Sequence, residues 1–512
     1  MYNERILQEV AKSISVSIER YKAADQRYES LSDWLIRPES KVVKYAPHIY
    51  IHGSFSLDTA INPIEGEEFD LDIMCCLTKL TTSDITEYEL KQLVGKEIAL
   101  YAEKYGMELP EDRTRAWTIN YSESSQFHMD VIPSIPIGMS NPVYLTYKDS
   151  DLYRQIHTPW EKVSNPKGFL EWFNSKSIEN LQERRNVYAR EKNVCIEAIG
   201  KHEIKSTLQE VVMLLKRHRD VFFHNAEENW IKDNKVLSII ITTLAGQYYS
   251  GQSNLAEAFV ETVENIEQGI KYKSKGDIEY RNFIYNENFS IEDKDFQILN
   301  PSYPEENFTD KWKDESDKKR AFFMWLTQLK QDVKELKMLL LGESSKTKIL
   351  YKMFGNGIKE AVKQFLCHDI IINESKYIKK LNFPLNWIEN VNIRAYASYK
   401  NISHIHEAYL LGDQVESGDV INKDNNLLFV AQTTAFEPYD VYWQVANKGM
   451  EAIDEDGIRG EIIREPKKIY DKFSRYQRKE GAKYSGRHWI RCFVVKNNYC
   501  VAISDKFYVE VR

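Results

Sequence analysis

The chain has 512 residues, of which 42% are hydrophobic and 29% are charged, so it is too apolar for a disordered protein and long enough for roughly two to four domains. Its 69 lysines and arginines and 77 acidic residues leave a net charge of −8, which argues against binding nucleic acid over the whole surface. Its six cysteines form no CxxC pair, the first residues hold no apolar signal core, and no apolar run reaches membrane length. We therefore expect a cytoplasmic protein without membrane insertion, whose contacts with polyanions are confined to a pocket or stripe.

Apolar side chains at helical spacing predict an amphipathic helix over residues 1–37. A strand-rich stretch follows, interrupted by one helix over 82–106 that ends on Gly106. The strands of this stretch are expected at 49–51, 69–76, 117–121 and 127–132. Buried helices are expected at 205–223, 236–249 and 316–341. The segment 251–315 is polar and turn-rich.

The pattern of the sequence changes in its last third. Glycines, serines and lysines interrupt the periodicity over 346–380, which predicts a linker. Short strands separated by turns follow, and they are clearest at 427–432, 441–445, 489–495 and 499–504. We therefore expect an α+β protein: residues 1–345 form a small mixed sheet with helices and a helical lobe, and residues 381–512 form a separate β-rich domain.

Three aspartates lie in the predicted strands of the first domain. Asp70 and Asp72 are two residues apart in one strand, so their side chains lie on the same face. Asp130 lies in the middle of a second apolar strand that can pair with the first. Three converging carboxylates repel one another unless a cation neutralises them, and hard oxygen ligands suit Mg²⁺ or Mn²⁺. The pattern predicts a two-metal site for an in-line displacement at phosphorus.

Gly53 and Ser54 come between the first strand and a short helix, where free backbone N–H groups can bind phosphate oxygens. Each signal is weak by itself, because an Asp-x-Asp pair at a strand end is usually solvated or caps a turn. The order in which the signals occur, with Gly-Ser before Asp-x-Asp and a single Asp on a later apolar strand, favours a catalytic site.

This order resembles the polymerase-β-type nucleotidyltransferase superfamily, whose shared motif is Gly-Ser, then Asp-x-Asp, then a third Asp. Further segments resemble the bacterial cGAS/DncV-like nucleotidyltransferases, also called CD-NTases or the SMODS family. These segments are 164–169, 172–173, 208–211, 216–220, 235–244, 300–301, 306–308 and Trp312. One departure is Asp58-Thr59, where the family often has Gly-Thr.

The resemblance implies a template-independent enzyme that joins NTPs, with ATP expected among them, into a cyclic oligonucleotide second messenger for CBASS-like antiphage defence. A downstream effector would respond to the product. The resemblance also implies that Asp70, Asp72 and Asp130 bind the metal ions and catalyse in-line attack of an acceptor hydroxyl on the α-phosphate, with release of pyrophosphate. Nucleotide-binding roles are implied for Gly53, Ser54, Thr59, Lys216, Ser238 and Asn307.

Alternatives remain open at this point. The enzyme could make a linear oligonucleotide or transfer a nucleotide to RNA or protein, or the chain could be a catalytically silent nucleotide sensor. Lys216 and Asp220 are four residues apart on a predicted helix, so a simple ion pair is an alternative role for Lys216. For residues 217–220 we expect structural pairing between helices.

The last domain contains a basic stretch. Residues 464–487 hold nine lysines and arginines against three acids, with interleaved tyrosines and a phenylalanine, which suits a nucleotide or other polyanion but also suits a solvated loop. Residues 381–512 resemble the AGS-C sensor domain, at Trp443, Asn447, Gly449, Ala452, 459–460, 484–488 and Cys492. The resemblance implies an unidentified ligand. Candidate ligand-sensing residues are Arg475, Arg478, Lys479 and His488.

Overall fold

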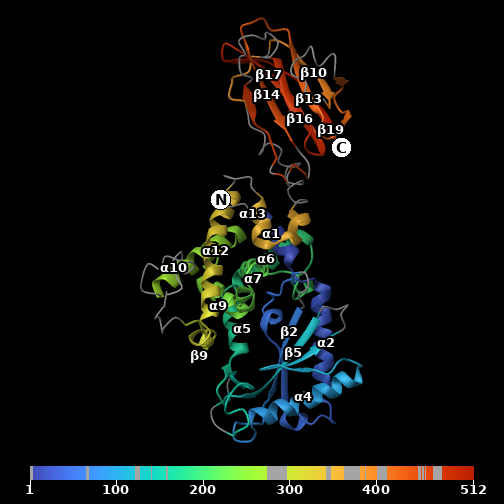
Figure 1. Cartoon of the computed structure of the whole chain (residues 1–512). Helices are drawn as coiled ribbons and strands as arrows, with labels where there is room; N and C mark the ends of the chain where they lie inside the picture. The colour runs from blue at the N-terminus through green and yellow to red at the C-terminus, as the bar shows by residue number, and fades with distance from the viewer. Residues whose placement is uncertain are drawn as a thin grey trace. The chain divides into compact units, whose positions relative to one another are not determined.

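A computed structural model of the whole chain shows two compact units, one containing the elements from α1 to η5 and the other containing strands β10 to β19 (Figure 1). The structure describes residues 4–64, 69–121, 127–139, 141–156, 160–273, 297–341, 347–362, 381–386, 388–399, 412–447, 451–452, 455, 457–464 and 476–512. Within these residues, no helix combines the length and the apolar character that a membrane span requires.

A mixed sheet organises the first unit. Its strands are ordered β1-β2-β5-β4-β3, with β6 beside β5 and β7 beside β6, and only β2 and β5 run parallel among the paired strands described. The strands are β1 (Pro47–Ile51), β2 (Phe69–Leu77), β3 (Glu111–Asp112), β4 (Trp117–Asn120), β5 (Phe127–Pro136), β6 (Val143–Leu145) and β7 (Val163–Ser164). A short helix, α3 (Gly53–Ser56), connects β1 towards β2.

Two helices, α2 (Ile18–Ile36) and α4 (Glu87–Lys104), cover one face of this sheet and pack against each other. The strands turn alternate apolar side chains towards them, among them Leu71, Ile73 and Val131, and these form the main core of the unit. Because successive side chains of a strand point to opposite faces, the intervening polar residues of β2 and β5 lie on the other face.

The predicted single helix over 1–37 is wrong, because the structure has two helices, α1 (Arg5–Ile14) and α2. Ser17 caps α2 by accepting a hydrogen bond from the Arg20 backbone N–H. The Asn62 side chain donates a hydrogen bond to the Ser15 carbonyl at 2.8 Å. This contact links the break between α1 and α2 to a loop that is distant in sequence. The break therefore has both a local cap and a tertiary partner.

A helical lobe completes the first unit, with α7 at its centre. Its elements are α5 (Pro166–Ser175), α6 (Ile178–Lys192), η3 (Ile196–Ala198), α7 (Thr207–His224), α8 (Asn229–Asp233), α9 (Ser238–Tyr248), α10 (Leu255–Lys273), β8 (Leu299–Asn300), β9 (Tyr303–Asn307), η4 (Asp310–Lys313), α12 (Ser316–Leu340), α13 (Lys348–Phe354) and η5 (Asn356–Ile358). Nearly every residue of α7 is buried, because α1, α9, α10 and α12 all pack against it.

Two parts of the lobe differ from what the sequence indicated. The helix α10 lies in the segment 251–315, for which the sequence predicts polar turns; its apolar residues Leu255, Phe259 and Val263 recur at helical spacing and are buried. The helix α13 lies in the predicted linker, yet Leu350 and Phe354 are buried in the first unit. Residues 363–380 of that linker lie outside the described residues.

The second unit is a β-sandwich, which confirms the separate β-rich domain. One sheet has the order β11-β10-β13-β16, and the other has β12-β19-β17-β14-β15 with β18 beside β17. Phe429 of the first sheet and Trp443 and Val494 of the second belong to one buried core. The strands are β10 (Val391–Ser398), β11 (Asp413–Val415), β12 (Val420–Ile421), β13 (Asn426–Thr433), β14 (Asp440–Ala446), β15 (Ile462–Arg464), β16 (Gln477–Gly481), β17 (Gly486–Lys496), β18 (Tyr499–Ile503) and β19 (Phe507–Val511).

Candidate active site

The three predicted aspartates lie together on the face of the sheet opposite α2 and α4. In the parallel pairing of β2 with β5, Asp72 lies beside Asp130 and Asp70 lies beside His128. Thr118 of β4 is the next residue along the same row, beside Asp130. The alternation along β2 and the register with β5 therefore bring the carboxylates together, as the sequence indicated.

Burial and like charges raise the affinity of this group for protons. Burial, then the charges of Asp70 and Asp130, raises the pKa of Asp72 to about 7, while Lys216 opposes the shift. Burial also raises the pKa of Asp130, although the Thr118 hydroxyl donates to its Oδ1 at 2.5 Å. The Asp70 carboxylate contacts His128 Nε2 at 2.5 Å.

Chemically, the three carboxylates suit a divalent cation, because oxygen ligands and concentrated negative charge are what Mg²⁺ and Mn²⁺ prefer. The three carboxylates do not converge on one point, since Asp70 contacts His128 and Asp130 accepts a hydrogen bond from Thr118. Across the described residues, no group of three or more His, Cys, Asp or Glu side chains is arranged to hold a metal ion.

Gly53 lies directly against the central aspartate. Its φ is +66°, in the left-handed region, and a Cβ built on it would lie 2.1 Å from Asp72 Oδ2. Only glycine satisfies both the backbone and the space at this position. Gly53 therefore allows both the close approach to Asp72 and the backbone conformation at the start of the loop that follows.

We expect Gly53→Ala to lower turnover by roughly 10²-fold, because the methyl group displaces either the loop or Asp72. The matched control is Gly106→Ala: Gly106 has a φ of +63° but nothing within 4 Å of the added Cβ. Both variants should lose about 1–2 kcal/mol of stability through backbone strain, measured by denaturant unfolding, but only Gly53→Ala should lose activity. Equal activity of the two variants would contradict the close fit to Asp72.

A cavity of about 1100 Å³ opens over this face of the sheet. It is lined by all nine residues for which catalytic or nucleotide-binding roles were expected in the first domain: Gly53, Ser54, Thr59, Asp70, Asp72, Asp130, Lys216, Ser238 and Asn307. These residues come from β2, β5, α7, α9, β9 and the loop around α3, so the fold brings together positions that are up to about 250 residues apart. The volume is large enough for a small-molecule ligand.

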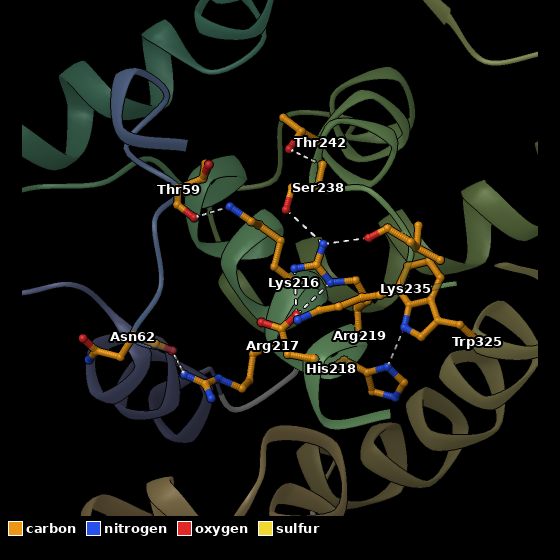
Figure 2. Close-up of polar contacts among 12 residues, drawn as sticks. Thr59, Asn62, Lys216, Arg217, His218, Arg219, Lys235, Ser238, Thr242 and Trp325 are labelled. Carbon is orange, nitrogen blue, oxygen red and sulfur yellow. Dashed lines mark hydrogen bonds and ion pairs between the residues drawn. The ribbon is translucent and has the colours of Figure 1, made fainter. Parts of the chain in front are cut away.

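Lys216 enters the cavity from α7 and is almost fully buried (Figure 2). Its Nζ donates to the Thr59 carbonyl at 2.9 Å. Burial, followed by the charge of Arg219, lowers the pKa of Lys216 to about 7. Asp220 pairs with Arg219 at 2.7 Å and with Lys235 at 3.0 Å, so the simple Lys216–Asp220 ion pair is not what the structure shows.

Structural pairing between helices was expected for residues 217–220, and His218 makes such a contact with α12, whereas Arg217 contacts a loop. Arg217 donates to the Asn62 carbonyl, and Trp325 Nε1 donates to His218 Nδ1 at 3.0 Å (Figure 2). Arg219 was expected to be structural only, yet it also lines the cavity and donates to Ser238 Oγ at 2.9 Å. It therefore connects the predicted Ser238 site to the centre of the lobe.

Sequence reasoning missed a group of cations on another side of the cavity. Arg115, Lys162 and Lys311 line it, and each lies over the ring of Tyr147, at 5.7, 5.1 and 5.8 Å from its centroid. Arg115 and Lys162 lie in separate loops and Lys311 lies in η4, and no local pattern in the sequence connects them. Lys162 pairs with Asp310 at 2.6 Å, so the positive charge of the group is partly neutralised, and the charge that remains favours anions.

The candidate sensing residues of the second unit are placed differently from one another. On β16, Lys479 is exposed and Arg478 pairs with Glu480 at 2.8 Å. On β17, His488 is buried and its Nε2 contacts the Tyr484 carbonyl at 2.7 Å. Arg475 lies outside the described residues. A ligand-sensing role for these four stays a prediction.

Comparisons with known proteins agree with this geometry. Residues 47–133 match the nucleotidyltransferase domain of the cyclic GMP-AMP synthase DncV-like family, and residues 372–512 match the adenylyl/guanylyl and SMODS C-terminal sensor domain, AGS-C. A c-di-GMP synthase of Roseivirga ehrenbergii is 27% identical over 358 residues, which cover 69% of this chain and 84% of that protein. The CD-NTase CdnG of Bradyrhizobium diazoefficiens, solved in complex with GTP, has a similar fold, with a TM-score of 0.50 and 19% identity over 70% of this chain and 98% of that one. The chain is therefore a nucleotidyltransferase with a DncV-like nucleotidyltransferase domain at residues 47–133 and an AGS-C domain at residues 372–512.

Proposed function

We propose that this enzyme joins NTPs into a cyclic oligonucleotide and acts in antiphage defence. The observation that carries the catalytic part is the single cavity lined by the three aspartates, the Gly-Ser pair and Lys216. Carboxylates on one wall and cationic and hydroxyl groups on the others suit a nucleoside triphosphate, whose phosphates need both ions and donors. The family match and the c-di-GMP synthase relative support a cyclic product.

In the proposed reaction, a hydroxyl oxygen of the acceptor nucleotide attacks the α-phosphorus of the donor. The new P–O bond forms as the bond to the β-phosphate breaks, and pyrophosphate leaves with that electron pair. Asp130 accepts the hydroxyl proton at its carboxylate, which the hydrogen bond from Thr118 orients. Asp70, Asp72 and Asp130 would hold Mg²⁺ or Mn²⁺, which polarises the phosphate and lowers the pKa of the attacking hydroxyl.

Lys216 and Ser238 are the residues proposed to bind the donor phosphates. Lys216 is already in the cavity, and the only hydrogen-bond partner of its Nζ among the described residues is the Thr59 carbonyl. A triphosphate is a stronger acceptor than a carbonyl group, because both partners are then charged. We propose that Lys216 exchanges the carbonyl for phosphate when the donor binds.

Incubation with labelled NTPs tests the product. GTP and ATP should each be supplied alone and together, because the relative is named a c-di-GMP synthase and ATP was expected from the family resemblance. A product that resists phosphatase but not a phosphodiesterase supports cyclisation. A phosphatase-sensitive product would instead identify a linear oligonucleotide synthase, and labelled RNA or protein would identify a nucleotide-modifying transferase. NTP binding without any product would indicate a nucleotide sensor.

We expect Lys216→Ala to raise the KM for the donor NTP by roughly 10- to 150-fold, since a charge-assisted contact to phosphate contributes about 1.5–3 kcal/mol. Ser238→Ala should have the same effect but a smaller one, because its hydroxyl is neutral. Steady-state kinetics with saturating metal measures both, and the melting temperatures show whether the variants are folded. An unchanged KM in Lys216→Ala would restrict Lys216 to a structural role at Thr59.

The defence role and the sensing role of the AGS-C domain are further parts of this proposal. The match of residues 372–512 to a sensor domain supports the sensing role. Cells that express the full chain together with an effector that responds to its product should resist phage, and cells that express the Asp72→Asn chain with the same effector should not. Equal plaque numbers in the two strains would contradict a defence role that depends on catalysis.

A further inference from the structure

Asp58 stands where the related family often has glycine, and its backbone has the conformation that glycine favours. Its φ is +55°, which costs a residue with a side chain more than it costs glycine. Its carboxylate contacts the Nδ1 atom of His202, a residue 144 positions away in the helical lobe. Only 15% of the Asp58 side chain and 12% of the His202 side chain are exposed. The side chain of Asp58 therefore adds a mostly buried contact to the helical lobe that a glycine at this position would not make.

The surroundings hold His202 in place. Its ring stacks on Tyr21 of α2, with centroids 4.3 Å apart and an angle of 10° between the planes. Tyr21 is buried and packs edge-on against Phe55 of α3, at 5.2 Å. Lys205 Nζ lies 5.0 Å from the centroid of Tyr21 and adds positive charge near Asp58. The partner of Asp58 is thus fixed by packing on both α2 and α3.

Asp58 belongs to a loop, residues 57–62, that α7 holds by its backbone carbonyls. Gln209 donates to the Leu57 carbonyl at 3.0 Å, Lys216 to the Thr59 carbonyl at 2.9 Å, and Arg217 to the Asn62 carbonyl (Figure 2). The loop directly follows Gly53 and Ser54, and the Thr59 N–H donates back to the Ser54 carbonyl at 3.0 Å. This hydrogen bond couples the loop to the Gly-Ser pair.

Under the proposed function, the contact of Lys216 with the Thr59 carbonyl is broken when the donor nucleotide binds. If Lys216 moves to the donor phosphate, the middle of the loop loses its hydrogen bond to α7. Asp58 and His202 do not line the cavity, so a nucleotide bound there leaves their contact in place. Asp58 directly precedes Thr59, whose carbonyl Lys216 would leave.

We propose that Asp58 and His202 form a positioning pair, which holds the loop 57–62 in its binding geometry while Lys216 changes from the Thr59 carbonyl to the donor triphosphate. This inference rests on the donor-binding role proposed for Lys216. Without the pair, only a fraction of molecules keep the loop in place once Lys216 has left, and the apparent affinity for NTP falls by that fraction. The chemical step, which takes place at the aspartates, is little changed.

The test compares Asp58→Gly with the wild-type chain, using the Kd for GTP and for ATP by calorimetry and the steady-state kcat and KM. We expect Kd and KM to rise about tenfold, with kcat within about twofold of wild type. Glycine relieves the backbone at φ +55°, so a loss of folding does not explain the change. The matched control is Asp424→Gly in the second unit, an aspartate with a φ of +68°, which should leave all three constants unchanged.

Three further variants show whether the two residues act as a pair. His202→Ala should raise Kd as much as Asp58→Gly, and the double variant should be no worse than either single one. Asp58→Asn should recover part of the affinity, because asparagine tolerates this backbone and can still accept from the imidazole. Additive effects in the double variant, or an unchanged Kd in Asp58→Gly, would overturn the pair. A wild-type chain that binds GTP or ATP but makes no cyclic product would contradict the proposed function alone, since Kd still tests the pair. A wild-type chain that binds neither would overturn both.

Discussion

Asp72→Asn is expected to reduce nucleotidyl transfer by about 10³-fold or more, because it removes the central charged ligand of the proposed metal site. Asp70→Asn should have the same direction of effect, and the double variant should form no product. Product formation is measured with labelled GTP and ATP over a range of Mg²⁺ and Mn²⁺ concentrations. The variants should fold normally, since asparagine has nearly the shape of aspartate. Turnover retained in the double variant would contradict the metal site.

The same substitution should change stability in a pH-dependent way. The pKa of Asp72 is raised from 3.8 to about 7, so the folded chain holds this proton more tightly than the unfolded chain does. The free energy of unfolding of the wild-type chain therefore falls as pH rises from about 4 to about 7. Above this range the folded chain must hold the Asp72 carboxylate in its ionised form, buried beside two other carboxylates. In EDTA, Asp72→Asn should melt above the wild type at pH 8, and the difference should shrink at pH 5. Mg²⁺ should raise the melting temperature of the wild type more than that of the variant.

Asp130→Ala is expected to lose bond formation by about 10³-fold while it keeps most of its affinity for the donor NTP. Asp130 is beside Asp72 but one strand farther from the Gly-Ser loop, which places it at the proposed acceptor side. Calorimetry with GTP or ATP gives the affinity, and single-turnover experiments give the rate of bond formation.

Thr118→Val is the control for this variant, because it removes only the hydrogen bond to Asp130 Oδ1 and keeps the carboxylate. Its rate should fall less, by about tenfold. If NTP affinity collapses together with activity in Asp130→Ala, Asp130 belongs to the donor site instead.

The sequence by itself determined those features that depend on local order and on strand alternation. The two-residue spacing of Asp70 and Asp72 places both on one face of any strand, and the apolar spacing along α4 and α7 predicts those helices. The motif order around Gly53 predicts the three aspartates and the Gly-Ser pair, and the family resemblance adds Thr59, Lys216, Ser238 and Asn307. All of these residues line one cavity, and their roles stay predictions. Ser17 is a residue type that often caps helices, but the sequence did not predict the helix start there, because the apolar spacing continues across it.

Only the tertiary structure decided which distant side chains meet. The register of β2 with β5, which places Asp72 beside Asp130, follows from packing the whole sheet against α2 and α4. Lys216 donates to a backbone carbonyl 157 positions away, and the pattern of side chains along the sequence does not predict this partner. The contact between Asp58 and His202 joins the loop 57–62 to the helical lobe, and Lys311 of η4 meets the Tyr147 ring only when the lobe packs against the sheet. Sequence periodicity reports which face of an element is buried, whereas the contacts between elements depend on how those faces pack.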